Sequence, residues 1–163
     1  MDETIKRLLV EAELKILAAG SVFSVQDFSI SLSKKQLLSF LSPYLDQGEV
    51  GLVVPNIYYT VKFSNLFNPP KALPPDLSKV LAALTRLTGE SFQYDGGYCA
   101  NRLGLSTQIP LYHVLHTSGR SRRFKLAGVD VVLNHMDVKL IKAIKDQLSL
   151  EEYAKLLSAD FPK

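Results

Sequence analysis

Residues 33–61, SKKQLLSFLSPYLDQGEVGLVVPNIYYTV, decide the fold of the first half of this chain. Ser33 and Gln36 have the spacing of a capping box, which predicts the start of a helix, and a glycine follows the apolar residues that would end it. β-branched and aromatic runs at 50–54 and 57–61 are separated only by a proline and an asparagine, a pattern typical of a two-residue hairpin. The stretch therefore predicts a helix followed by a β-hairpin.

Two further helices are predicted ahead of this stretch. In the first, apolar residues recur at helical spacing, and they are Ile5, Leu8, Leu9, Ala12, Ile16 and Leu17. The second, at residues 24–28, has room for one or two turns. Three helices followed by a hairpin are the element order of a winged helix-turn-helix domain, which we assign to residues 1–66.

A proline-rich segment separates the two halves of the sequence. Residues 67–75 contain four prolines, which forbid a helix interior and disfavour strand pairing, so we expect a linker there. Beyond it we predict a helix from Asp76 to about Gly89, strands at 91–94, 111–116, 122–126 and 129–134, and helices at 138–148 and from 150 onward. The fold class is therefore α+β, with a small α+β domain at residues 76–163 whose sheet is mostly antiparallel.

Composition is that of an ordinary globular protein. Apolar residues make up 47% of the 163 residues, which is enough to bury a core. The amino terminus lacks the apolar stretch of a secretion signal, and no segment approaches the roughly 20 apolar residues that span a bilayer. We therefore expect a cytoplasmic protein. The single cysteine, Cys99, cannot form an internal disulfide, and we expect it to be a small buried apolar residue.

Charge is distributed unevenly along the chain. Residues 1–63 hold six Lys or Arg against seven Asp or Glu, a net charge of −1, and residues 64–163 hold thirteen against nine, a net charge of +4. The window 99–145 alone holds eight basic residues against Asp130 and Asp137. The second half should therefore attract a polyanion more strongly than the first.

A winged helix places the first residues of its third helix against base edges in the major groove, while its hairpin contacts the DNA backbone or minor groove. The residues predicted to contact duplex DNA in this way are Lys34, Lys35, Gln36, Ser39, Asn56 and Lys62. Gln36 could pair with an adenine edge, and the lysines could meet guanine or phosphate. The alternative is that these are solvated polar residues of a protein-interaction module.

The second half contains two candidate binding segments. Polar side chains gather in the run from Gly96 to Pro110, and three arginines gather in the glycine turn Ser118-Gly119-Arg120-Ser121-Arg122-Arg123. The predicted binding surface comprises Tyr98, Asn101, Arg102, Ser106, Thr107, Gln108, Arg120, Arg122, Arg123 and Lys125. With the lysines at positions 139, 142 and 145, the arginines could form a phosphate-binding patch. The alternative is a solvated hairpin edge beside the wet face of a helix.

Signatures of an enzyme are missing from the sequence. His113 and His116 are three residues apart on a predicted strand, so their side chains should point to opposite faces and cannot share a metal. The serines lack a nucleophile elbow, and Gly96-Gly97 lacks the lysine of a phosphate loop. We therefore expect no catalytic residues, no cofactor and no metal.

Four segments carry a resemblance to a known family. They are Gly97 to Pro110, Thr117 to Arg123, Asn134-His135, and Gly20 to Ser24 with the helix and hairpin that follow. On these segments the chain resembles the AbiEi-type abortive-infection antitoxins of bacterial type IV toxin–antitoxin systems and their relatives among transcriptional regulators.

The resemblance implies a winged helix that binds inverted repeats near its own promoter and represses its own operon. It also implies a second domain that counteracts a nucleotidyltransferase-like toxin, not necessarily by direct contact. Because symmetric operators usually need two DNA-binding units, a homodimer on DNA is expected. The competing hypothesis is an interaction module without sequence-specific DNA binding, whose basic surface meets an acidic partner or RNA.

Overall fold

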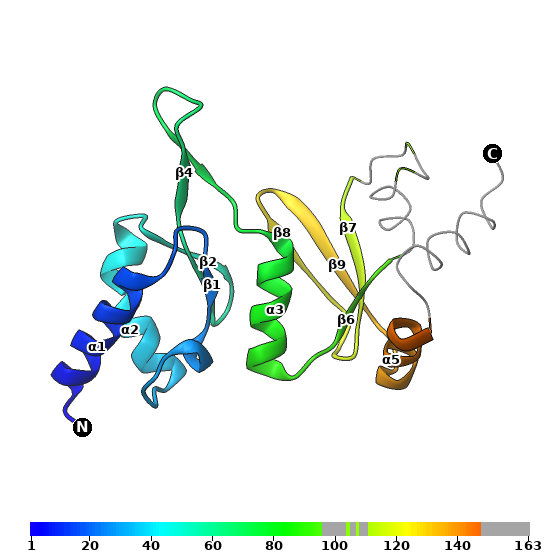
Figure 1. The fold of residues 1–163 in the computed structure, drawn as a ribbon, viewed down its shortest axis with the longest axis horizontal. Helices are drawn as coiled ribbons and strands as arrows, with labels where there is room; N and C mark the ends of the chain where they lie inside the picture. Colours follow the sequence, from blue (N-terminus) through cyan, green and yellow to red (C-terminus); the bar gives the residue numbers. More distant parts are fainter. Residues whose placement is uncertain (96–103, 105–106, 108–110, 148–163) are drawn as a thin grey trace. The chain divides into compact units, whose positions relative to one another are not determined.

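The structure is a computed structural model that describes residues 1–95, 104, 107 and 111–147. The chain divides into two units, Met1–Gly89 and Glu90–Lys163, and each unit combines helices with β-sheet (Figure 1). The predicted α+β class is therefore confirmed.

The first unit begins with helices and ends with strands and a further helix. Its elements in chain order are α1 (Glu3–Ile16), β1 (Val22–Phe23), the 3₁₀ turn η1 (Val25–Asp27), α2 (Lys34–Asp46), β2 (Val50–Val54), β3 (Ile57–Thr60), β4 (Lys62–Ser64), β5 (Lys71–Leu73) and α3 (Leu77–Thr88). Three strands form an antiparallel sheet in the order β1-β3-β2, and β4 pairs with β5 in a separate hairpin (Figure 1).

Local side-chain hydrogen bonds explain where the helices begin. Ser33 and Gln36 form the predicted capping box at α2, and Ser24 and Asp27 form a second one at η1. The second predicted helix is therefore a single 3₁₀ turn of three residues. At α3, the Asp76 carboxylate accepts a hydrogen bond from the Ser78 amide at 2.9 Å.

The predicted two-residue hairpin is confirmed. β2 and β3 pair antiparallel around the turn at Pro55 and Asn56, and Asn56 has a φ of 72°, which asparagine tolerates better than most residues. Gly51 lies opposite Tyr59 in the register, and a Cβ atom at Gly51 would overlap the Tyr59 ring. The missing side chain therefore lets the tyrosine lie across the sheet.

The core of the first unit lies between α1, α2 and the β1-β3-β2 sheet. Phe23 is stacked on Tyr58 with ring centroids 6.0 Å apart and makes an edge contact with Phe28 at 5.8 Å. The buried core residues are Val10, Leu14, Phe23, Leu37, Phe40, Leu41, Val50 and Tyr58. Of the six apolar residues that predicted the first helix, Leu17 alone packs against this core, and it does so partly buried.

The boundary between the units lies at Gly89, not in the proline-rich segment predicted as a linker. α3 packs on β1, β3 and η1, and Arg86 joins it to Asp27 by an ion pair of 2.6 Å and to the Val22 carbonyl at 3.2 Å. This helix, predicted to open the second domain, therefore belongs to the first unit. Residues 71–73 within the predicted linker form strand β5, which pairs with β4 despite the prolines on either side.

The second unit is a mixed sheet with a helix. Its described elements are β6 (Phe92–Tyr94), β7 (His113–Thr117), β8 (Arg122–Leu126), β9 (Val129–His135) and α5 (Val138–Gln147). The strand order is β6-β7-β9-β8, in which the β7–β9 pair is parallel and the other two pairs are antiparallel. α5 packs on β6 and β7. The mostly antiparallel sheet is confirmed, and the helix predicted from residue 150 lies outside the described residues.

Within the described ranges, no helix combines the length and the apolar composition needed to cross a bilayer.

Candidate nucleic-acid interface

The first turn of α2 presents two exposed lysines. The capping box at Ser33 fixes the helix start, so that Lys34 and Lys35 are its first two residues, and both side chains are exposed. The amino end of a helix carries a partial positive charge because its first backbone amides have no partner within the helix. Two ammonium groups and a helix amino terminus therefore lie within one turn.

Acidic residues are absent from the sequence around this turn. No Asp or Glu occurs between Asp27 and Asp46, and none occurs between Glu49 and Asp76. Of the acidic residues that flank these stretches, Asp27 is paired with Arg86. Although residues 1–63 carry a net charge of −1, the sequence around the start of α2 is therefore positively charged.

The outward face of α2 is polar and carries small side chains. Leu37, Phe40 and Leu41 are buried, and the opposite side of the helix exposes Lys35, Ser39 and Ser42. Leu38 adds an apolar side chain that is 48% exposed. Ser42 and Leu38 were not predicted as contacts, although the helical spacing from Ser39 and Lys35 would have placed them beside those residues.

Gln36 has a structural role that conflicts with base recognition. The Gln36 side-chain oxygen accepts a hydrogen bond from the Ser33 backbone amide at 3.0 Å, and the Gln36 backbone amide donates to the Ser33 hydroxyl at 3.1 Å. A bidentate contact with adenine needs both the oxygen and the nitrogen of the side chain. The prediction for Gln36 is therefore replaced by a capping role.

The structure separates the two residues that were predicted to lie together in the hairpin. Asn56 lies in the turn before β3, whereas Lys62 lies after β3, as the first residue of β4. Six residues of extended chain at about 3.3 Å each separate them by up to about 20 Å. Lys62 is adjacent to Val61, whose amide bonds to Glu49 beyond the carboxyl end of α2. Lys62 is therefore remote from the Asn56 turn.

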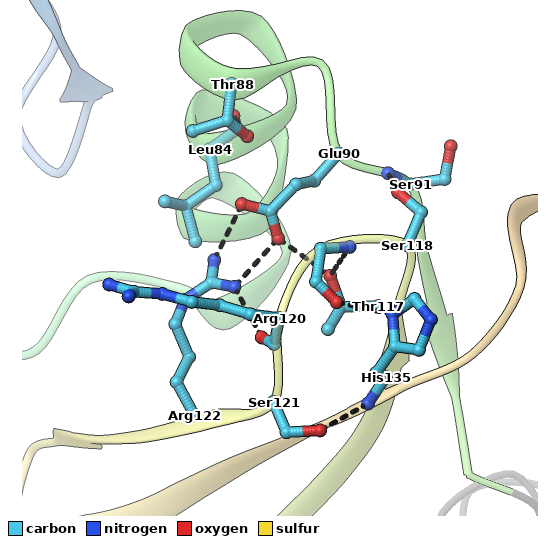
Figure 2. Close-up of polar contacts among 11 residues, drawn as sticks. Leu84, Thr88, Glu90, Ser91, Thr117, Ser118, Arg120, Ser121, Arg122 and His135 are labelled. Atoms are coloured by element: carbon cyan, nitrogen blue, oxygen red, sulfur yellow. Dashed lines mark hydrogen bonds and ion pairs between the residues drawn. The ribbon is translucent and has the colours of Figure 1, made fainter.

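In the second unit, the arginine turn is organised by a carboxylate that the sequence did not reveal. Figure 2 shows Glu90 between the Arg122 guanidinium and the Thr117 hydroxyl. Arg122 donates to both carboxylate oxygens, at 2.8 and 3.0 Å, and Thr117 donates to one of them at 2.7 Å. The Arg122 side chain also donates to the Arg120 carbonyl at 3.1 Å. Arg122 therefore holds the turn in shape, which corrects its prediction as a free phosphate ligand.

Further hydrogen bonds hold the same turn against its neighbours (Figure 2). The His135 amide donates to the Ser121 hydroxyl at 2.8 Å, and the His135 Nδ1 lies 2.7 Å from the Gly119 carbonyl oxygen. A Cβ atom at Gly119 would overlap the Glu90 carboxylate, so a side chain at this position would displace Glu90 from its hydrogen bonds. The turn is thus built by Glu90, which precedes β6, and by residues from β7 and β9 as well as by its own sequence.

The remaining basic residues of the turn are placed differently. Arg120 and Arg123 are exposed, and Arg123 shares one face of β8 with Lys125. The Lys125 ammonium lies 3.6 Å from the Asp130 carboxylate and is 71% exposed, so this ion pair is weak. On α5, the side chains of Lys139 and Lys142 are exposed. The candidate patch is therefore smaller than predicted, since Arg122 is engaged and Lys125 is partly neutralised.

The structure describes only Gly104 and Thr107 of the polar run from Gly96 to Pro110. Thr107 is exposed, and the predicted residues Tyr98, Asn101, Arg102, Ser106 and Gln108 lie outside the described residues. Among the residues that are described, no group of three or more His, Cys, Asp or Glu side chains is arranged to hold a metal ion.

The described parts thus define an α+β protein. One unit exposes two lysines at the start of a helix, and the other holds an arginine turn fixed by hydrogen bonds within that unit. The chain belongs to the DUF6088 family, a family of unknown function whose sequence profile matches residues 9–154. No curated protein and no solved structure matches the chain. The resemblance to AbiEi-type antitoxins accordingly stays a hypothesis.

Proposed function

We propose that this protein is a DNA-binding transcriptional regulator whose first unit acts as a winged helix-turn-helix domain. Two features of the fold support the proposal. The unit runs from α1 through β1, η1 and α2 to the β2–β3 hairpin, and the short β1 strand pairs with that hairpin. In this arrangement α2 would be the recognition helix and the β2–β3 turn at Asn56 would be the tip of the wing.

The observation that carries the proposal is the exposure of Lys34 and Lys35 at the capped start of α2, in a stretch free of acidic residues. Helix amino termini bind phosphate groups, and each neutralised phosphate releases counterions and so contributes to affinity. Capping by Ser33 and Gln36 would hold both lysines in position before DNA arrives.

Base contacts would come from the outward face of α2. Ser39 and Ser42 offer hydroxyl groups that can donate or accept, and exposed Leu38 could contact a thymine methyl group. α2 has 13 residues, a length of about 20 Å, which is sufficient to lie along the major groove.

The proposal is tested with two lysine substitutions and a matched control. We expect the Lys34→Ala, Lys35→Ala double variant to bind duplex DNA from upstream of its own gene about 10- to 100-fold more weakly, with a salt dependence reduced by about two phosphate contacts. Lys79→Ala removes another exposed lysine, from α3, and should leave affinity within about twofold. Equal losses in both variants would refute a specific role for α2.

The biological role proposed for this regulator is that of an antitoxin, and it rests on the resemblance described above. The first unit would repress the operon that encodes it, and the second unit would counteract a nucleotidyltransferase-like toxin. Co-expression with the neighbouring gene tests this role directly. Restored growth with the full chain, and no rescue when the second unit is disrupted, would support it. Neighbouring genes without growth toxicity would refute it.

A second candidate function is favoured by the exposed cations of the second unit. Arg120 and Arg123, with Lys139 and Lys142 on α5, could meet an acidic partner or RNA without sequence-specific DNA binding. The Arg120→Ala, Arg123→Ala double variant separates the two functions. A regulator should keep its preference for upstream DNA in this variant, whereas a general polyanion-binding module should lose most of its binding.

A further inference from the structure

α1 carries apolar residues on two opposite sides, and only one of these sides packs in the core of the first unit. Val10 and Leu14 are buried in the core of the first unit. The large apolar residues that α1 and the residue before its cap leave exposed are Met1 (75%), Ile5 (50%), Leu8 (59%), Leu9 (36%) and Ile16 (82%). Ala12 is exposed beside them. These six residues are called the outer stripe below.

Helical geometry confirms that the outer stripe is one continuous surface. At about 100° per residue, its five helical members fall within an arc of about 100°, and the centre of that arc lies roughly opposite the side that carries Val10 and Leu14; Met1 precedes the helix. Isolated exposed leucines are ordinary, but a contiguous apolar stripe of this length commonly marks an interaction site.

The stripe has a symmetry that indicates its occupant. Reversing the helix about the midpoint between Leu8 and Leu9 exchanges those two residues, and it also exchanges Ile5 with Ala12, while Ile16 maps beyond the amino end of the helix. Every exposed apolar position from Ile5 to Ala12 therefore maps onto another one. Two copies packed antiparallel would place apolar residues opposite each other over residues 5–12, with the large Ile5 facing the small Ala12 on both sides of the axis.

We propose that the outer stripe of α1 is the interface of a homodimer in which two α1 helices pack antiparallel about a two-fold axis near Leu8 and Leu9. An isologous interface requires one patch that is complementary to itself, and the outer stripe meets that requirement. The proposal goes beyond DNA binding and does not depend on it. It would give a regulator two recognition helices for a two-fold operator.

The charge around the stripe favours a second copy over an anionic membrane surface. The largest apolar patches on monomers measure about 300–600 Å², and two patches of that size packed together bury on the order of 1,000 Å², near the lower limit of specific interfaces. We therefore expect a dimer of moderate affinity. Residues 1–16 hold four acidic and three basic side chains, a net charge of −1, which gives no attraction to anionic lipid.

The first test is sedimentation equilibrium of the full chain over a concentration series. Leu8→Glu places a charge at the centre of the stripe in both copies and should raise the dimer dissociation constant at least about 100-fold. Leu52→Glu is the matched control, because Leu52 on β2 is 54% exposed and lies outside the stripe. A monomer at all concentrations, or a dimer that Leu8→Glu leaves intact, would overturn the proposal. Circular dichroism of both variants is the check that each is folded.

The second test uses disulfide crosslinking in a Cys99→Ser background. Near the two-fold axis, a single Leu8→Cys substitution places the two thiols close together, so we expect a crosslinked dimer under mild oxidation. Ile16→Cys should not crosslink, since the two positions 16 lie at opposite ends of the helix pair, about 22 Å apart. Crosslinking at both positions would indicate parallel helices, and crosslinking at neither would exclude the interface.

Discussion

Replacing Arg122 by alanine should destabilise the second unit by about 2–3 kcal/mol. The Glu90 and Arg122 side chains are 15% and 26% exposed and are joined by two contacts, at 2.8 and 3.0 Å. Removing one partner of a fully buried ion pair costs about 3–5 kcal/mol, because the other charge stays buried without compensation. Partial exposure of this pair lowers the expected cost.

Hydrogen exchange reports on this unit separately, whereas thermal unfolding of two units need not be a single transition. In the Arg122→Ala variant, amides of β7 and β9 should exchange about 30- to 160-fold faster if they open through global unfolding of the unit. Arg123→Ala is the control, since Arg123 is exposed on the same strand and its loss should change stability by less than about 0.5 kcal/mol. Equal exchange rates in the two variants would refute a structural role for Arg122.

Three other substitutions test local features. Ser33→Ala removes the cap of α2 and should lower the free energy of unfolding by about 1 kcal/mol in urea titrations; an unchanged midpoint would contradict the capping role. Gly119→Ala should reduce protection of the second unit by displacing Glu90 from Arg122, and wild-type exchange would show that the turn tolerates a Cβ atom. Burial raises the pKa of Tyr58, so the unfolded chain loses this proton first and folding stability falls as pH rises through the ordinary tyrosine range. The free energy of unfolding of Tyr58→Phe should therefore fall less than that of the wild type between about pH 9 and 11. An equal fall in the two proteins would contradict the coupling of Tyr58 ionisation to unfolding.

Features set by neighbouring residues were predictable from the sequence. The capping box at Ser33, the cap at Asp76 and the turn at Asn56 each depend on side chains within about four positions, and all three are present. The strands of the second unit were also predicted to within a few residues, because β-branched runs and turn residues bound them.

Features set by distant residues were not predictable in this way. α3 was assigned to the wrong unit because its anchor, the Arg86–Asp27 pair, joins positions 59 apart. Glu90 was missed because nothing in its local sequence links it to Arg122, 32 residues away. Periodicity located α1 correctly but pointed to its exposed side, because a helix with two apolar sides has the same periodicity on each, and only tertiary packing selects Val10 and Leu14.

Sequence-specific DNA binding is tested most directly by comparing the affinities of the wild-type chain for two DNA duplexes. Binding to duplex DNA from upstream of its own gene is measured beside an unrelated duplex of equal length, at several salt concentrations. A sequence-reading regulator should prefer the upstream duplex by about 10³-fold or more and should bind both more weakly as salt rises. Equal affinity for the two duplexes, or no binding to either, would contradict the proposal that α2 and its hairpin read DNA.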